Sequence, residues 1–93
     1  MKKIISSGGK VFTDLGFPQE EAVVLSMRAD LMAYLCLTVE KHNWTQVEAA
    51  QVLGISQSRV SDLMRGKWDK FSLDMLVTLA ARAGLHCELK LAA

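Results

Sequence analysis

The sequence predicts a mainly helical domain that ends in a single β-strand. Between residues 18 and 84, apolar side chains recur at helical spacing in segments bounded by capping and breaking residues. In residues 85–91 the period changes to two, the pattern of a strand with one apolar face. A chain of 93 residues forms one domain. We divide it into an N-terminal arm, residues 1–17, and a helical body with a terminal strand, residues 18–93.

The arm begins with Ile4 and Ile5, followed by two serines and two glycines, a stretch too flexible for a stable helix. The residues expected to tether its second half to the body are Val11, Phe12, Leu15 and Phe17. Two other roles are open for the arm. Its lysines are suited to contact phosphates or a minor groove, and the two isoleucines are suited to fold back as a partner for the terminal strand.

A long helix is expected over residues 18–41. Pro18 suits the first helical position, and two glutamates follow in the first turn, where the helix dipole favours acidic side chains. The residues expected to face the core are Leu31, Met32, Leu35, Cys36 and Val39. Other apolar residues, Leu25, Met27 and Tyr34 among them, extend beyond one face. We therefore expect the N-terminal half of this helix to contact a second chain as well.

Residues 45–66 predict two short helices joined by a tight turn. Thr45 and Glu48 form a capping box at the start of the first helix. Gly54 is suited to the left-handed conformation that ends this helix. Ile55 is apolar within the turn, so we expect it to fill the angle between the two helices.

The second short helix begins after Ser56, which is suited to cap it, and ends at Gly66. Its inner face is narrow and consists of Val60, Leu63 and Met64. The outward residues are short or planar hydrogen-bonding groups, namely Gln57, Ser58, Arg59, Ser61 and Asp62. Such groups reach base edges in the major groove of DNA, where Gln matches adenine and Arg matches guanine. We therefore predict that these residues read DNA sequence.

The two short helices resemble the helix-turn-helix of the lambda-repressor-like and Cro-like regulators, often called the XRE family. The residues at its characteristic places are Gln46, Ala50, Gly54, Ile55, Val60 and Leu63. The resemblance implies a lambda-repressor-like bundle in which residues 56–65 form the recognition helix, while Gln46 and nearby amides hold a phosphate. The predicted phosphate contacts are Thr45, Gln46, Ser56, Arg65 and Lys67. A bare helical hairpin is the alternative, but it would need neither the Gln-Ser-Arg start nor a glycine inside the turn.

The loop after Gly66 combines two lysines with Trp68 and Phe71. The lysines are suited to phosphate contacts, and we expect the two aromatic residues to anchor the loop in the core. Ser72 then caps a last helix, which Gly84 ends. The residues of this helix expected to face inward are Leu73, Leu76, Val77 and Ala80.

The terminal strand places Leu85, Cys87, Leu89 and Leu91 on one face. Such a strand needs a partner for its backbone hydrogen bonds and cover for its apolar face. A second copy of the chain offers both. We therefore predict a two-fold homodimer joined through this strand, which would present two recognition helices to a palindromic operator in double-stranded DNA.

Charge and composition limit the function further. The formal net charge is only +1, but residues 57–70 carry four basic side chains against two acidic ones, so the predicted DNA face is the positive side. The cysteines and histidines fall in no catalytic or zinc-binding spacing, so we expect no enzyme, no cofactor, no metal, and buried, reduced thiols. We also expect a cytoplasmic protein without membrane contact, because no apolar run approaches the ~20 residues that span a bilayer.

Most of the chain also resembles a narrower group, the small HigA-like antitoxins of bacterial toxin–antitoxin operons. The matching segments are residues 11–17, 28–31, 44–46, 49–50, 53–63 and 71–74. The resemblance implies a repressor of its own operon that can bind a RelE-like ribonuclease toxin. The chain has no long acidic tail of the kind that many antitoxins wrap around a toxin, so a stand-alone repressor is one alternative. A protein-interaction module that keeps the helix-turn-helix shape without binding DNA is another.

Overall fold

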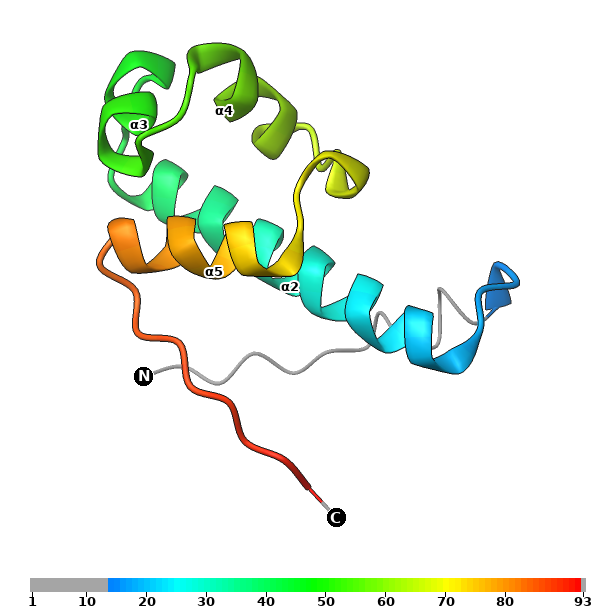
Figure 1. Cartoon of the computed structure of the whole chain (residues 1–93). Coiled ribbons are helices and arrows are strands. Elements are labelled where there is room, and N and C mark those ends of the chain that lie inside the picture. The colour runs from blue at the N-terminus through cyan, green and yellow to red at the C-terminus, as the bar shows by residue number, and fades with distance from the viewer. Residues whose placement is uncertain (1–13, 93) are drawn as a thin grey trace.

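The computed structural model describes residues 14–92, and within them the chain is mainly helical, as predicted. The elements in chain order are α2 (Gln19–Lys41), α3 (Gln46–Leu53), α4 (Gln57–Met64), the 3-10 helix η1 (Trp68–Lys70) and α5 (Leu73–Arg82) (Figure 1). The long helix α2 forms the base of the domain, and α5 packs on it. Helix α4 also packs on α2, and α3 packs on α5. The N-terminal half of α2 projects beyond the other helices (Figure 1).

The helix boundaries follow from local signals. Pro18 lies one residue before α2 as its cap, where we expected it at the first helical position, because its ψ of 149° is extended. Its carbonyl oxygen still accepts the first helical hydrogen bond, from the N–H of Ala22 at 2.8 Å. Thr45, Ser56 and Ser72 cap α3, α4 and α5 through their side-chain oxygens, as predicted.

One buried cluster joins the base to the other helices. Its most deeply buried large members are Leu35, Leu53, Leu63, Phe71, Leu76 and Leu79, each at most 1% exposed. They come from α2, α3, α4, the loop before α5, and α5 itself. Trp68 packs against this cluster and against the smaller one formed by Ala22 and Leu25. The expected anchoring of the loop by its two aromatic residues is therefore confirmed.

The buried face of α5 is rotated about the helix axis relative to the predicted face. Leu76 and Ala80 are buried as expected, but Val77 is 40% exposed and Leu79 is fully buried. The sequence of α5 is apolar at both sets of positions, so its periodicity does not choose between them. Packing against α2 and α3 makes the choice.

The hydropathy of α2 corrects a second expectation. This 23-residue helix has a mean hydropathy of 1.6 over its most apolar window, so it is long and apolar enough to cross a membrane, where we expected no such run. The core helix of a globular domain passes the same test of length and composition. In this structure 39% of the window is buried inside the domain, including Met32, Leu35 and Val39. The helix is thus used here as the base on which the other helices pack.

Only residues 14–17 of the predicted arm are described. Phe17 packs edge-on against Trp68, with 6.4 Å between the ring centroids, so this part of the expected tether is confirmed. Leu15 is exposed and takes no part in it, because the chain turns outward before α2. Val11, Phe12 and the lysines of the arm lie outside the described residues.

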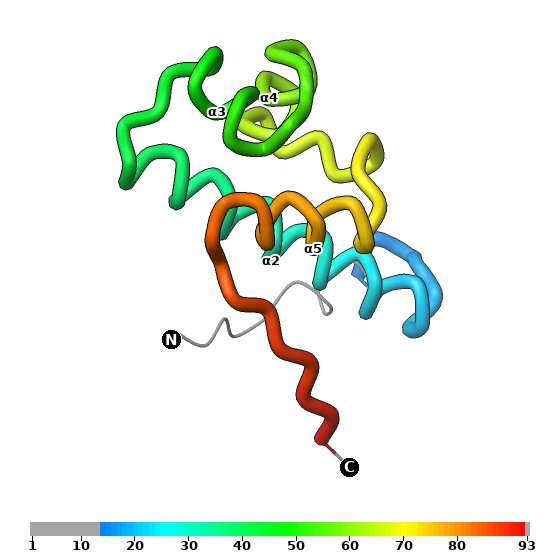
Figure 2. Tube along the Cα trace, turned by 60° about the vertical axis from the view of Figure 1, so that its left-hand side comes forward, coloured from blue at the N-terminus to red at the C-terminus, as the bar shows by residue number. Residues whose placement is uncertain are grey.

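The segment after α5 is extended, but it forms no strand within residues 14–92. Leu85 is half-buried against the main core, and the chain then runs away from the body (Figure 2). Leu89 and Leu91 are 78% and 87% exposed. A strand requires a hydrogen-bonding partner, and the described part of one chain supplies none for this segment. The strand and the dimer stay predictions, and the alternative partner, the isoleucine pair of the arm, lies outside the described residues.

Gly54 is held between its own helix and α5. Its φ of +68° lies in the left-handed region, as predicted for the residue that ends α3. Arg82 of α5 donates a hydrogen bond from Nη1 to the carbonyl oxygen of Leu53, at 2.9 Å. This bond places a cation at the C-terminal end of α3, where the helix dipole favours it. A Cβ on Gly54 would lie 3.1 Å from the same nitrogen.

A comparison with Gly66 separates two costs of placing a Cβ at Gly54: the backbone strain and the close approach to Arg82. Gly66 has a φ of +71°, but a Cβ there would meet no atom within 4 Å. We expect Gly66→Ala to lower the free energy of unfolding by about 1–2 kcal/mol through strain alone. Gly54→Ala should lower it by about 0.5–1 kcal/mol more, since the guanidinium must also move. Urea unfolding measures both values, and an extra cost for Gly54→Ala that persists in an Arg82→Ala background would contradict this explanation.

Candidate nucleic-acid interface

Helices α3 and α4 both begin at residues with side-chain caps, and one apolar residue fills the turn between them. Thr45 Oγ1 accepts the N–H of Glu48 at 3.1 Å, and Glu48 Oε1 accepts the N–H of Thr45 at 3.0 Å, which is the predicted capping box. Ser56 Oγ accepts the N–H of Arg59 at 3.2 Å. Ile55 packs against two of the buried clusters. The two helix starts are therefore capped, and Ile55 anchors the turn between them in the core.

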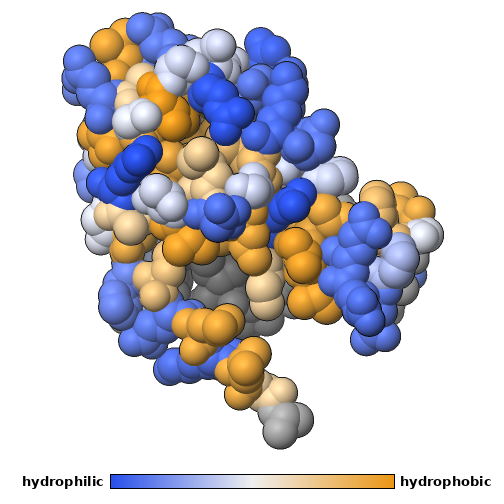
Figure 3. Space-filling model, in the orientation of Figure 1, coloured by the Kyte–Doolittle hydropathy of each residue, from blue (hydrophilic) through white to orange (hydrophobic). Residues whose placement is uncertain are grey.

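Helix α4 separates a fully buried side from a polar side. Val60 and Leu63 have no exposed surface, whereas Met64 beside them is half-buried. In Figure 3, hydrophilic residues gather over α4 and the turn that follows it. The helix thus presents polar groups outward on a backbone that cannot rotate without exposing its apolar side.

The predicted base-reading residues fall into two groups. Gln57 and Ser58 are exposed at the first turn of α4. Arg59, Ser61 and Asp62 are half-buried. All of them lie off the buried face of the helix, and their contacts with bases stay a prediction.

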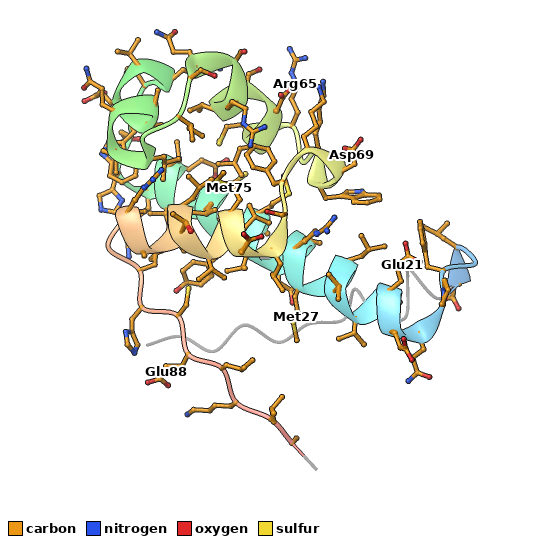
Figure 4. All side chains as sticks on the ribbon, viewed as in Figure 1. Glu21, Met27, Arg65, Asp69, Met75 and Glu88 are labelled. Atoms are coloured by element: carbon orange, nitrogen blue, oxygen red, sulfur yellow. The ribbon has the colours of Figure 1, made fainter. Side chains whose placement is uncertain are left out.

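The predicted phosphate contacts border the same surface. Thr45 and Gln46 are exposed at the start of α3, and Ser56 is exposed at the start of α4. The two hydroxyl oxygens accept amide hydrogens, which leaves each hydroxyl hydrogen for donation to a phosphate oxygen. Arg65 points away from the body at the end of α4 (Figure 4). Lys67 is also near the end of α4, but it is already paired with a carboxylate.

Arg59 makes contacts that helical spacing did not reveal. Its guanidinium carbon lies 4.4 Å from the centroid of the Phe71 ring, in a cation–π arrangement. Its Nη1 donates a hydrogen bond to the carbonyl oxygen of Lys70, at 3.3 Å. The side chain is therefore drawn toward the loop that follows α4. No sequence signal relates these residues, because the contact depends on how η1 folds back along the helix.

Asp62 likewise has partners that the sequence did not indicate. Its carboxylate lies 3.5 Å from the Nζ of Lys67 and 3.8 Å from the Nζ of Lys70. The structure thus adds Lys70, which we had not included among the phosphate contacts, to the basic side chains at this end of α4. A charge-pair search over short separations would have suggested the two pairs, but only the turn after the helix brings them together.

The two cysteines lie in different surroundings. Cys36 is half-buried beside an apolar groove of about 300 Å³ between α2 and the end of α4. Its Sγ–H donates to the carbonyl oxygen of Leu63 at 3.4 Å. Burial, and then the charge of Glu40, raises the pKa of this thiol. Cys87 is exposed, where we expected a buried thiol, because its segment leaves the body.

Within residues 14–92, no three potential metal ligands lie together.

These features define a class of protein: a small helical domain whose α3 and α4 form a helix-turn-helix with a polar outer face. A family model described as a helix-turn-helix domain matches residues 11–92 of the chain. The chain belongs to this helix-turn-helix family, and its motif is that of a DNA-binding regulator. No curated protein sequence matches the chain significantly.

The surroundings of Cys36 predict a slow and pH-shifted reaction with iodoacetamide. The thiolate is the reactive form, and the raised pKa leaves less of it at a given pH. In a Cys87→Ser variant, we expect alkylation of Cys36 to be slower in the native protein than in urea. The alkylation rate should also increase at a higher pH in the native protein than in the unfolded protein. Mass spectrometry of timed samples measures both. A native profile at the same or lower pH than the unfolded one would contradict the burial of this thiol.

Proposed function

We propose that the protein is a sequence-specific transcriptional repressor of the XRE type, which binds a palindromic operator as a homodimer with α4 as its recognition helix. The main supporting observation is that α4 buries Val60 and Leu63 while it exposes Gln57 and Ser58 at its N-terminal end. That end contacts base edges when such a helix enters the major groove. The proposed activity is binding in the cytoplasm, without catalysis, cofactor or metal.

Arg59 would read a base only after it leaves its partners in the domain. Its cation–π contact with Phe71 is of a kind worth about 0.5–1 kcal/mol at exposed sites. A good bidentate contact with guanine contributes about 1–3 kcal/mol of discrimination. Release of the guanidinium would therefore be favourable on a matching base and unfavourable on others. The net gain on a matching base would be smaller than the full value of the guanine contact, because the contact with the ring is lost.

The proposed dimer is supported by charge and by the C-terminal segment. A formal net charge of +1 provides little general attraction to DNA, so one domain alone would bind weakly. The extended segment carries exposed Leu89 and Leu91 beyond the body, with its backbone available for pairing. Antiparallel pairing with the same segment of a second copy would cover these side chains and would close after two subunits.

We propose a HigA-like antitoxin role as a second candidate, supported by the N-terminal half of α2. Val23, Val24 and Met27 are exposed there. Met27 points to the opposite side of the domain from Arg65 (Figure 4). A protein bound at these side chains, such as a RelE-like toxin, would leave the polar side of α4 open. Co-purification with the product of a neighbouring gene tests this role, and a mixture that elutes as separate proteins would count against it.

Gln57 and Arg65 should affect DNA binding in different ways. Selection from a random duplex library supplies the preferred sequence. Gln57→Ala should lose about 1–3 kcal/mol of binding free energy on that sequence and little on random DNA, because a base contact is lost. Arg65→Ala should weaken binding to both and reduce the salt slope by about one, because a phosphate contact is lost. Fluorescence anisotropy at several salt concentrations measures all four values. Equal losses on both DNAs for Gln57→Ala would refute base reading by this residue.

The dimer interface is tested on the exposed C-terminal segment. Leu89→Gln combined with Leu91→Gln should shift the protein toward monomer in sedimentation velocity, because the apolar face of the paired strands is lost. Operator affinity should fall by about 100-fold, as expected when two linked sites become independent. His86→Gln, on the other face of the segment, is the matched control and should change neither property. A double variant that stays dimeric and binds normally would exclude this interface.

A further inference from the structure

The turn after α4 carries two lysines that one carboxylate holds. Lys67 Nζ lies 3.5 Å from Asp62 Oδ1, and Lys70 Nζ lies 3.8 Å from Oδ2, so each carboxylate oxygen has its own lysine. The lysine side chains are 40% and 50% exposed, whereas the side chain of Asp62 is 20% exposed. The carboxylate is therefore the inner member of the group. The lysines are the members that can leave it for another anion.

The backbone and the core keep this group in place. The N–H of Lys67 donates to the carbonyl oxygen of Asp62, at 3.1 Å. The carbonyl oxygen of Lys70 accepts the hydrogen bond of Arg59, whose guanidinium lies over the buried ring of Phe71. The two lysines and the carboxylate thus form an ion-paired group, and Arg59 holds the backbone of Lys70 to the core. They lie at the C-terminal end of the proposed recognition helix and in the turn beyond it.

We propose that Asp62 is a specificity-determining residue that restrains Lys67 and Lys70 and so suppresses binding to DNA that α4 does not fit. The inference rests on the proposed function and adds a means of discrimination to it. Non-specific affinity comes almost wholly from lysines and arginines that displace counterions from phosphates. A carboxylate between two such lysines offers them an internal anion and repels phosphates. It therefore lowers affinity for any polyanion.

At a matching site the carboxylate gains a replacement partner. When α4 is seated in the major groove, phosphates lie beside the turn, and Asp62 lies on the helix that faces the base edges. A carboxylate there accepts a hydrogen bond from the amino group of cytosine. The lysines then pair with phosphates, and the carboxylate accepts a hydrogen bond from a base. Every charged group therefore still has a partner. On other DNA the carboxylate loses its lysines without compensation, and the exchange is unfavourable.

Heparin, a polyanion without bases, tests the restraint by itself. Asp62→Asn removes the charge and keeps the size, and Asp69→Asn is the matched control. Asp69 is exposed in the same turn and has no ion pair among residues 14–92 (Figure 4). We expect Asp62→Asn to elute at higher salt than Asp69→Asn, and the difference to vanish when Lys67 and Lys70 are both alanine. Equal elution of the two single variants, or a difference that survives loss of the lysines, overturns the restraint.

Duplex DNA then tests the specificity. On random duplex, Asp62→Asn should bind about three- to tenfold tighter than Asp69→Asn, because two lysines are released. On the selected operator it should bind no tighter, so the operator-to-random ratio falls. Asp62→Glu keeps the charge and should keep most of the ratio. An unchanged ratio in Asp62→Asn overturns the proposal. A wild-type protein that binds no duplex would instead refute the proposed function, while the heparin result would still decide whether Asp62 restrains the lysines.

Discussion

The packing of α4 on α2 and of α3 on α5, through one leucine cluster that all four helices share, is the constraint on which the rest of the structure depends. Each of the two short helices has only 8 residues. Isolated helices shorter than about 12–15 residues are marginal in water. They persist here because Leu53 and Leu63 are buried with Leu35 in one core, where each leucine contributes about 1.5–3 kcal/mol relative to exposure. The same burial holds the polar side of α4 outward, so the core and the candidate interface are inseparable.

Electrostatics in this domain depend on arrangement more than on total charge. The net charge is +1, yet Lys67 and Lys70 meet around the carboxylate of Asp62 at the end of α4. Each exposed ion pair contributes little to folding. The ion pairs matter for the proposed DNA binding, because a lysine that is already paired with a carboxylate of its own chain is less available to the phosphates of non-matching DNA. A weakly charged domain with this network is suited to discrimination between DNA sites, which supports the repressor role that we propose.

Several large apolar side chains are exposed away from α4. Val23, Val24 and Met27 are exposed on α2, and two leucines are exposed on the C-terminal segment. A domain of this size buries a limited share of its surface, and clustered apolar side chains of this kind mark contacts with other proteins. The segment and the helix are separate surfaces, so a second copy and a different partner are compatible occupants.

The sequence by itself determined what depends on neighbouring residues. The caps at Thr45, Ser56 and Ser72, and the left-handed glycine at the end of α3, are local features, so the helix boundaries and the exposed start of α4 were predictable. Tertiary structure decided which of two apolar faces α5 buries, because both have helical period. It also decided that Arg59 lies on Phe71 and that Asp62 holds two lysines, since these contacts depend on how the loop folds back. The C-terminal segment has the sequence pattern of a strand, but a strand forms only against a second strand, and the described residues of one chain supply none.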